Sequence, residues 1–204
     1  MTNRESIDSY NGKAEKLVKQ YESSPFAEVY APIMDVFPTT PCKLLDLGAG
    51  SGRDSAALVK KGFTAVTVEP NAEMRKFGQM INNDKGMTWV DDALPELGAL
   101  KKLDLEGPYP LIISAGLWMH FDDAELDASM KRVAELLAPG GRFVLSLRHG
   151  PVPAGRKMFS TQPEVIIELG KKYGLAHVKH ILREDLHGRE EVKWTFMCLE
   201  KPAA

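Results

Sequence analysis

Residues 44–55 read Leu44-Leu45-Asp46-Leu47-Gly48-Ala49-Gly50-Ser51-Gly52-Arg53-Asp54-Ser55, and they decide the fold. The apolar run from Lys43 to Leu47 has the length of a buried parallel strand, and the apolar positions that begin at Ala56 predict a helix. Three alternate glycines lie between these two elements. Glycine tolerates positive φ and leaves the backbone bare, so N–H groups at the helix start can donate to a ligand. The stretch therefore predicts a strand, a ligand-binding turn and a helix.

Two acidic residues indicate which ligand the turn accepts. Glu69 lies about 20 residues beyond the glycines, at the end of the next apolar run, where a carboxylate can bind both hydroxyls of a ribose. Asp46 precedes the glycines, and its charge would repel a pyrophosphate and favour an ammonium or sulfonium. Arg53 stands where a dinucleotide-binding loop has its third glycine, and the Gly-Lys-Ser/Thr of a phosphate loop is absent. The turn thus favours a nucleoside that carries a positive charge.

The motif Leu-Leu-Asp-Leu-Gly-Ala-Gly-Ser-Gly resembles the first motif of the class I S-adenosylmethionine-dependent methyltransferases. Residues 52–55 are similar, more weakly, to those of the compact bacterial tellurite-resistance-type methyltransferases. A glycine-rich turn in another α/β fold is the alternative. The resemblance implies S-adenosylmethionine as the cofactor and methyl donor. The expected cofactor-binding residues are Asp46, Gly48, Ala49, Gly50, Glu69, Pro70, Asp92, Ala93 and Ser114.

The ends of the third and fourth predicted strands carry part of this cofactor site. In the family, an acid after the third strand, followed by a small residue, binds the adenine amino group. Asp92 before Ala93 fits this pattern best, with Asp91 as the alternative, although such a carboxylate can instead cap the following turn. Many relatives carry Asp or Asn where this chain has Ser114, and the Asp/Asn-Pro-Pro-Tyr signature of amino-nucleobase methyltransferases is missing. This departure argues against methylation of a nucleobase amine.

The remaining periodicity predicts an α/β fold with a Rossmann-like, doubly wound, seven-stranded sheet and helices on both faces. The sheet should be mostly parallel and end in a C-terminal antiparallel hairpin. The strands after the first are expected at 65–69, 87–90, 110–115, 142–147, 178–182 and 192–199. Helical spacing over 4–22, as one amphipathic helix or two short ones, and over 26–37 predicts an N-terminal helical preface. We expect one methyltransferase domain over 1–204, with a preface or lid at 1–40 and a Rossmann-like core at 41–204.

The acceptor site is expected where the preface meets the ends of strands four and five. The resemblance implies that the preface folds over the cofactor pocket, so Tyr10 and Tyr21 are candidate acceptor-binding residues, with ordinary packing as the alternative. His120 and His149 follow strands four and five. A neutral hydroxyl acceptor would benefit from a base poised near neutrality, which makes His120 the candidate catalytic base. A helix-start histidine bonded to the backbone is the alternative for His120.

Two arginines suggest the charge of the acceptor. Arg148 ends strand five, and Arg156 lies in the loop that follows it. A guanidinium binds a carboxylate or phosphate through two parallel hydrogen bonds, which suggests a small anionic acceptor. A surface position is the alternative for Arg156. The expected substrate-binding residues are Tyr10, Tyr21, Trp118, Arg148 and His149.

Composition narrows the function further. The 28 acidic and 26 basic residues nearly balance, so the net charge gives no positive electrostatic potential that would attract nucleic acid or an anionic membrane. Cys42 and Cys198 form no metal-spaced cluster, and no apolar run is long enough to span a membrane. We expect a cytoplasmic enzyme without a metal that methylates a small molecule by in-line displacement. The alternatives are a non-catalytic cofactor-binding regulatory protein, an aminopropyl transferase and a nicotinamide-dependent dehydrogenase. No motif specifies the acceptor or an oligomeric state.

Overall fold

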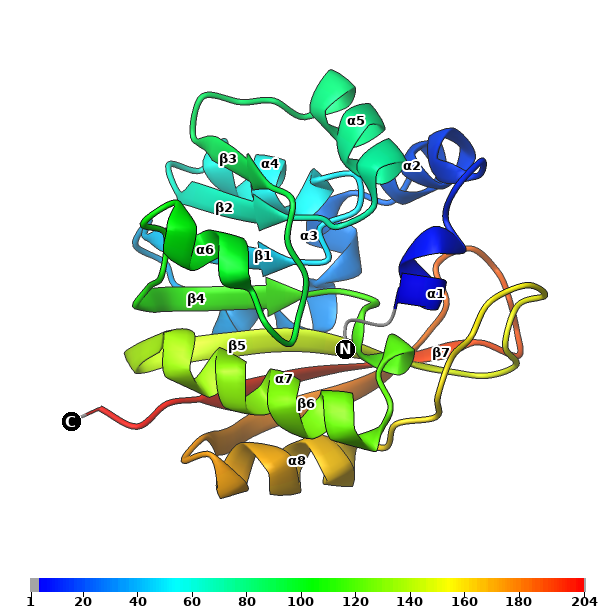
Figure 1. Cartoon of the computed structure of the whole chain (residues 1–204). Helices are drawn as coiled ribbons and strands as arrows, with labels where there is room; N and C mark the ends of the chain where they lie inside the picture. The colour runs from blue at the N-terminus through cyan, green and yellow to red at the C-terminus, as the bar shows by residue number, and fades with distance from the viewer. Residues whose placement is uncertain (1–3, 204) are drawn as a thin grey trace.

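The computed structural model describes residues 4–203 and has a seven-stranded sheet between two layers of helices (Figure 1). The ends of the expected domain, residues 1–3 and 204, lie outside this described part. The strands are β1 (Lys43–Leu47), β2 (Thr64–Val68), β3 (Met87–Val90), β4 (Tyr109–Ser114), β5 (Leu137–His149), β6 (Ala176–Glu184) and β7 (Lys193–Glu200).

The strand order is β3-β2-β1-β4-β5-β7-β6. The pairs from β3 to β5 are parallel, whereas β7 runs antiparallel to both of its neighbours. The predicted fold class, with its C-terminal antiparallel hairpin, is therefore confirmed. Because the chain leaves β3 at one edge and returns as β4 on the other side of β1, the strand order reverses between β1 and β4. Ligands in open α/β sheets bind at such a switch point.

Alternation along the strands divides the core between the two faces of the sheet. In β1, Leu44 and Leu45 are both fully buried but belong to different apolar clusters. Leu45 packs on the face covered by α6, α7 and α8, and Leu44 on the face covered by α3, η1 and α4. A parallel strand covered on both faces has to be apolar throughout, which explains the unbroken run in the sequence.

The helices surround the sheet as the periodicity indicates. Their bounds are α1 (Arg4–Asp8), α2 (Ala14–Glu22), α3 (Phe26–Val29), η1 (Ala31–Val36), α4 (Arg53–Val59), α5 (Ala72–Ile81), α6 (Gly98–Lys102), η2 (Trp118–His120), α7 (Asp123–Leu136) and α8 (Pro163–Lys172). Helix α2 packs on α5 through Ala14, Val18 and Met74. Figure 1 shows α1 and α2 on the side of the molecule toward which the parallel strands point. Within residues 4–203, no helix combines the length and apolar character that a membrane crossing requires.

The helical preface has the second of its two predicted forms, two short helices, because Gly12, with a φ of 71°, places a turn between α1 and α2. One strand differs from its predicted outline. Strand β5 begins at Leu137 rather than at Arg142, because Leu137 pairs with Tyr109 and the backbone of Gly140 and Gly141 hydrogen-bonds with that of Lys201. A register shift between Tyr109 and Leu111 of β4 absorbs this extension.

Candidate active site

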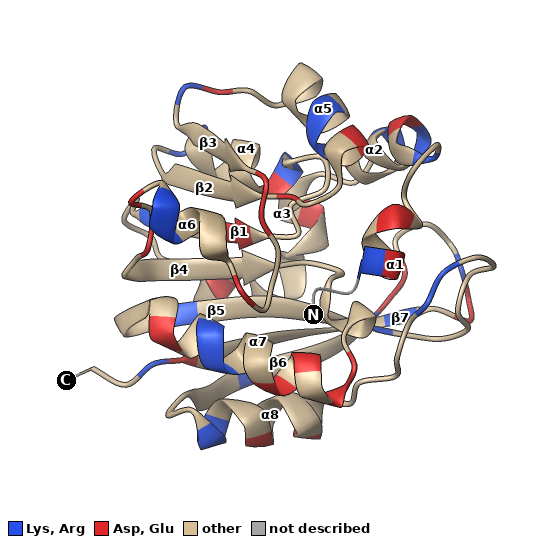
Figure 2. Ribbon diagram, viewed as in Figure 1, with Lys and Arg blue, Asp and Glu red and all other residues tan. Residues whose placement is uncertain are grey.

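A cavity of about 520 Å³ lies at the carboxyl ends of the strands, where the strand order reverses. Its volume is within the range of small-molecule and cofactor sites. The lining comes from the glycine loop, from the segments after β2, β3, β4 and β5, and from α1, α2 and the β6–β7 loop. Figure 2 shows acidic positions at the end of β1 and along the loop that follows β3.

The glycine loop presents bare backbone to this cavity. Gly48, Gly50 and Gly52 have φ values of 69°, 58° and 74°, a region that residues with a side chain rarely adopt. A Cβ on Gly50 would lie 3.4 Å from the Tyr21 ring, so the loop and α2 approach each other closely across the cavity. Of the predicted loop residues, Gly48, Ala49 and Gly50 all line the cavity.

Glu69 links the glycine loop to the end of β2. Its carboxylate accepts hydrogen bonds from the Gly50 N–H and the Asn71 N–H, each at 2.8 Å. Burial raises the pKa of Glu69 to about 7, against the opposing effect of these two N–H donors. Each carboxylate oxygen can accept a further hydrogen bond. Glu69 and Pro70 line the cavity, so this carboxylate can accept hydrogen bonds from two ligand hydroxyls.

Asp46 lies at the end of β1 in a buried polar network. Its carboxylate accepts a hydrogen bond from the Ser55 hydroxyl at 2.8 Å, and the Thr67 hydroxyl donates in turn to Ser55 at 3.0 Å. Burial and the neighbouring Asp54 charge raise the pKa of Asp46 well above its usual range. A positive charge on a ligand would favour the ionised form of Asp46.

The acid after β3 contacts both the protein and the cavity. Asp92 caps the start of α6, because its Oδ2 accepts from the N–H groups of Ala99 and Leu100 at 2.7 and 3.2 Å. Asp92 and Ala93 still line the cavity. Asp91, the alternative, lies outside the lining, and its carboxylate forms an ion pair with Arg75 at 2.8 Å.

Two predicted residues near the end of β4 do not line the cavity. Ser114 is fully buried, and its hydroxyl donates to the Leu47 carbonyl at 3.2 Å. Trp118 is also fully buried and packs against Phe143, with ring centroids 5.5 Å apart. The cavity wall at this point consists of the intervening segment 115–117. Sequence position placed Ser114 and Trp118 at the correct end of the strand but could not give the direction of their side chains.

The alternation of β5 separates the next two predicted residues. Arg148 lines the cavity, whereas His149 faces away from it and shares a hydrogen bond of 2.8 Å between its Nε2 and the Thr195 hydroxyl. Because successive side chains of a strand point to opposite faces, only one of the two can face the cavity.

His120 ends η2 and is held at both ring nitrogens. Its Nδ1 lies 3.2 Å from the Lys157 carbonyl, and its Nε2 lies 3.1 Å from the Tyr10 hydroxyl. A carbonyl oxygen can only accept, so the proton belongs on Nδ1, and the Tyr10 hydroxyl donates to Nε2. Burial lowers the pKa of His120, which keeps the ring neutral at neutral pH. The backbone contact considered as the alternative for His120 is therefore present, and the role of His120 as a base stays a prediction.

The preface brings both predicted tyrosines into the cavity. Tyr10 and Tyr21 line it, and burial raises the pKa of both phenols, so both stay protonated. The Arg156 guanidinium lies 4.6 Å from the centre of the Tyr10 ring. Arg156 is half-buried and lines the cavity, so it does not have the surface position considered as its alternative.

The sequence did not identify Asn71 as a residue of this site. Its side chain caps α5 through the Met74 N–H at 2.9 Å and donates to the Ile7 carbonyl and the Asn11 side chain at 2.9 and 2.8 Å. Asn before a helix is a recognisable cap signal, but the contacts with α1 and the following turn depend on tertiary structure. Asn71 therefore ties the preface to the end of β2.

Known proteins share this architecture. A family model described as a methyltransferase domain matches residues 21–186. An uncharacterized methyltransferase of Oceanobacillus iheyensis is 27% identical over 182 residues, which are 88% of this chain and 73% of that protein. One of Geobacillus kaustophilus is 26% identical over 154 residues, which are 70% of this chain and 66% of that protein. The match thus spans about two thirds of the Geobacillus relative.

Solved structures with low sequence identity have the same fold. A TehB-like S-adenosylmethionine-dependent methyltransferase from Corynebacterium glutamicum gives a TM-score of 0.64 at 18% identity, over 93% of this chain and 98% of that one. The Burkholderia thailandensis 1,6-didemethyltoxoflavin-N1-methyltransferase, with 1,6-didemethyltoxoflavin and S-adenosylhomocysteine bound, gives 0.63 at 19% identity, over 91% and 87% of the chains.

Proposed function

Since this chain belongs to the class I S-adenosylmethionine-dependent methyltransferases, we propose that it transfers the donor's methyl group to a small-molecule acceptor by in-line displacement. The observation that carries the proposal is one cavity that holds both the Glu69–Gly50 cradle and the Tyr10–His120 pair. The first is suited to a nucleoside, and the second to a proton on the acceptor. In-line methyl transfer requires the donor and the acceptor to be held together in one enclosure.

The donor end fits S-adenosylmethionine by its chemistry. The backbone of the glycine loop lines the cavity without side chains at Gly48 and Gly50, and Glu69 offers acceptors for the two ribose hydroxyls. Buried Asp46 favours a ligand that carries positive charge. Asp92 and Ala93 would lie beside the adenine. The donor, when bound, supplies a methyl group already activated on a sulfonium.

At the acceptor end, the chain orients the nucleophile and receives its proton. The Lys157 carbonyl fixes the Nδ1–H tautomer, so the lone pair of His120 is on Nε2, where the Tyr10 hydroxyl donates. For a neutral acceptor, the acceptor's proton moves to the Tyr10 oxygen while the Tyr10 proton moves to Nε2 of His120. A thiolate or a free amine would react without this step. Tyr21 would contribute its ring and hydroxyl to the wall.

The preface would serve as the lid of a domain whose core begins at β1. The Ser6 hydroxyl donates to the Lys157 carbonyl at 3.3 Å, so α1 and the loop after β5 meet over His120. Such closure excludes water from the reacting groups. The free thiols of Cys42 and Cys198 favour a cytoplasmic location, which we include in the proposal.

The test combines binding and turnover. Calorimetry measures the affinity of the donor site for S-adenosylhomocysteine. Methyl transfer is measured as the S-adenosylhomocysteine formed when S-adenosylmethionine is incubated with the protein and each metabolite of a panel of candidate acceptors. His120→Ala should lower turnover by about 100-fold or more with a neutral acceptor, because general-base catalysis contributes about that much. Its affinity for S-adenosylhomocysteine should stay within about twofold, a difference of less than about 0.5 kcal/mol.

His180→Ala is the matched control, since His180 is exposed on β6 and hydrogen-bonded to His177. It should keep wild-type turnover. Unchanged turnover of His120→Ala would remove the base from the mechanism. Donor binding without product from any acceptor would instead favour a regulatory protein that senses the cofactor.

A further inference from the structure

Two arginines of the cavity are left without a carboxylate to neutralise them. Arg148 is only 8% exposed, and its Nη1 donates to the Gly150 carbonyl at 3.3 Å. Arg156 stacks on the Tyr10 ring. Within residues 4–203, neither arginine forms an ion pair with a carboxylate. Burial of a guanidinium without a counter-charge lowers the stability of the folded protein, and a bound anion would offset this loss.

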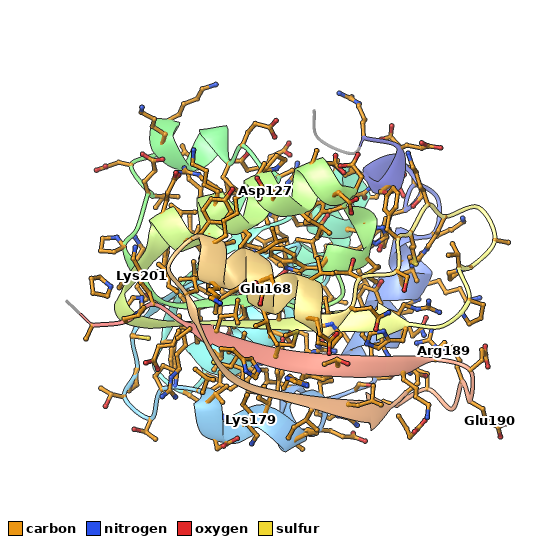
Figure 3. The ribbon with its side chains drawn as sticks, turned by 90° about the horizontal axis from the view of Figure 1, so that it is seen from below. Asp127, Glu168, Lys179, Arg189, Glu190 and Lys201 are labelled. Carbon is orange, nitrogen blue, oxygen red and sulfur yellow. The ribbon has the colours of Figure 1, made fainter. Side chains whose placement is uncertain are left out.

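The two acids of the β6–β7 segment that line the cavity, Glu184 and Asp185, are already engaged. Asp185 accepts hydrogen bonds from Arg189 at 2.6 Å and from the Trp194 indole at 2.9 Å. Glu184 forms an ion pair with Lys193 at 3.0 Å. Figure 3 shows Arg189 at the turn between β6 and β7, on the side of the molecule where α1 and the loop after β5 also lie. The positive charge of Arg148 and Arg156 is therefore left for a ligand.

Other arginines of the lining are satisfied by the protein. Arg53 pairs with Asp54 at 2.6 Å. Arg183 donates to the carbonyls of Glu28 and Val29, each at 2.8 Å. Arg183, like Arg148, has no carboxylate partner among the described residues, but two backbone carbonyls hold its guanidinium, whereas Arg148 donates to a single carbonyl at 3.3 Å. Burial and the charges of Arg189 and Arg156 lower the pKa of Arg148, and the charges of Asp185 and Glu191 oppose this shift without cancelling it.

Asp46 and Glu69 lie apart from Arg148 in the sheet. Asp46 is in β1 and Glu69 follows β2, at the donor side of the cavity. Arg148 ends β5, which lies two strands from β1 across β4. A ligand anion beside Arg148 would therefore be separated from the nucleoside cradle and close to the Tyr10–His120 pair.

We propose that Arg148 and Arg156 form an oxyanion subsite, and that the acceptor is a small molecule carrying a carboxylate or a phosphate group. This inference rests on the proposed methyl transfer and gives its acceptor a chemical class. A guanidinium binds either oxyanion through two parallel N–H groups, and Arg156 stacked on Tyr10 is already oriented to do so. The anion would hold the acceptor while its nucleophile lies toward Tyr10 and His120.

Titration of the S-adenosylhomocysteine-saturated protein tests the subsite. The probes are inorganic phosphate and acetate, each added at constant ionic strength against sodium chloride, with melting temperature and calorimetric affinity as readouts. At least one probe should raise the melting temperature of the wild type. Arg148→Met and Arg156→Met should weaken its affinity by about tenfold, the effect of losing one charge-assisted hydrogen-bond pair. The two probes distinguish a tetrahedral from a planar anion.

Two further variants keep the test decisive. Arg148→Lys retains the charge without the planar fork, so its affinity should lie between those of the wild type and Arg148→Met. Arg132→Met is the matched control, because Arg132 pairs with Glu106 outside the cavity; it should respond as the wild type does. Normal S-adenosylhomocysteine binding without any anion response in the wild type would overturn the subsite and leave the methyltransferase proposal standing.

A second result would also overturn the subsite. If Arg148→Met weakens S-adenosylhomocysteine itself by about tenfold or more, a loss of about 1.4 kcal/mol, Arg148 holds the carboxylate of the donor and not that of an acceptor. If the wild type does not bind S-adenosylhomocysteine at all, both the proposed function and the subsite that rests on it fail.

Discussion

At Gly52 the glycine loop needs both a positive φ and the absence of a Cβ. Its φ is 74°, and a Cβ would lie 2.6 Å from the Trp89 ring. Gly174 has a similar φ of 78°, but a Cβ there would have no neighbouring atom within 4 Å. We predict that Gly52→Ala lowers the free energy of unfolding by about 3 kcal/mol, and Gly174→Ala by about 1 kcal/mol. Urea denaturation of the two variants measures the difference, and equal losses would show that Trp89 moves aside.

The Tyr10 hydroxyl can be removed without removing the ring. Tyr10→Phe keeps the surface on which Arg156 stacks but deletes the donor to Nε2 of His120. We predict that kcat with a neutral acceptor falls by about tenfold to 100-fold, while affinity for S-adenosylhomocysteine changes by less than about twofold. A similar loss in both quantities would assign Tyr10 to lid packing.

The pH dependence of the same reaction locates the proton. Burial lowers the pKa of His120 below its usual 6.5, so the neutral ring persists to lower pH before protonation removes the base. The kcat of the wild type should therefore decline only below about pH 6.5. A decline that persists in His120→Ala would belong to another group.

At the scale of elements, Asn71 joins α5 to the preface. Asn71→Ala removes the cap of α5 and the bonds to Ile7 and Asn11. We predict a loss of about 1 kcal/mol in stability, with faster hydrogen exchange over residues 4–13 and weaker binding of S-adenosylhomocysteine. Exchange measured by mass spectrometry reports on the segment directly.

Asp122→Ala is the matched control for this prediction. Asp122 caps α7 in a capping box with Glu125, so its loss should also cost about 1 kcal/mol. Because this capping box lies within the start of α7, exchange over residues 4–13 should stay unchanged. Equal exchange in the two variants would mean that global destabilisation, and not the tie between Asn71 and the preface, loosens the lid.

Strands whose bounds are set by their own residues and the turn residues beside them were predictable from the sequence. The bounds of β1 and β3 agree with the apolar runs Lys43–Leu47 and Met87–Val90 to the residue. Burial on both faces imposes such runs, and glycine or turn residues end them. The predicted start of β5 was wrong because Leu137 pairs with Tyr109, and Gly140 and Gly141 with Lys201, through tertiary contacts that the Pro-Gly-Gly turn signal does not reveal.

The donor side of the site was more predictable than the acceptor side, because its residues lie close together in the sequence. Glycine spacing and the acid after β2 follow from one strand, turn and helix. The Tyr10–His120 contact joins residues 110 positions apart and depends on how the preface packs. Side-chain direction at Ser114 and His149 also follows from strand register, which a shift of one residue reverses.

At the scale of the whole molecule, the buried acids connect stability to pH. Folding raises the pKa of Glu69 from 4.5 to about 7, and burial raises that of Asp46 as well. A raised pKa favours the protonated folded state, so this contribution is full below about pH 4.5 and is lost as the pH rises through about 7. Histidines with lowered pKa, including His120 and His149, have the opposite effect, but only up to about pH 6.5.

The ligand-free protein should therefore lose stability between about pH 6.5 and pH 8, by up to about 1.4 kcal/mol per pH unit for each proton released. S-adenosylmethionine should counteract the loss, because its sulfonium favours ionised Asp46 and its ribose hydroxyls favour ionised Glu69. Its affinity should rise with pH over this window, and more steeply than that of S-adenosylhomocysteine, whose sulfur is uncharged. Urea denaturation across the window, with calorimetry in buffers of different ionisation enthalpy, measures both the slope and the released protons. Flat stability together with binding that releases no proton would show that both acids are already ionised in the folded protein.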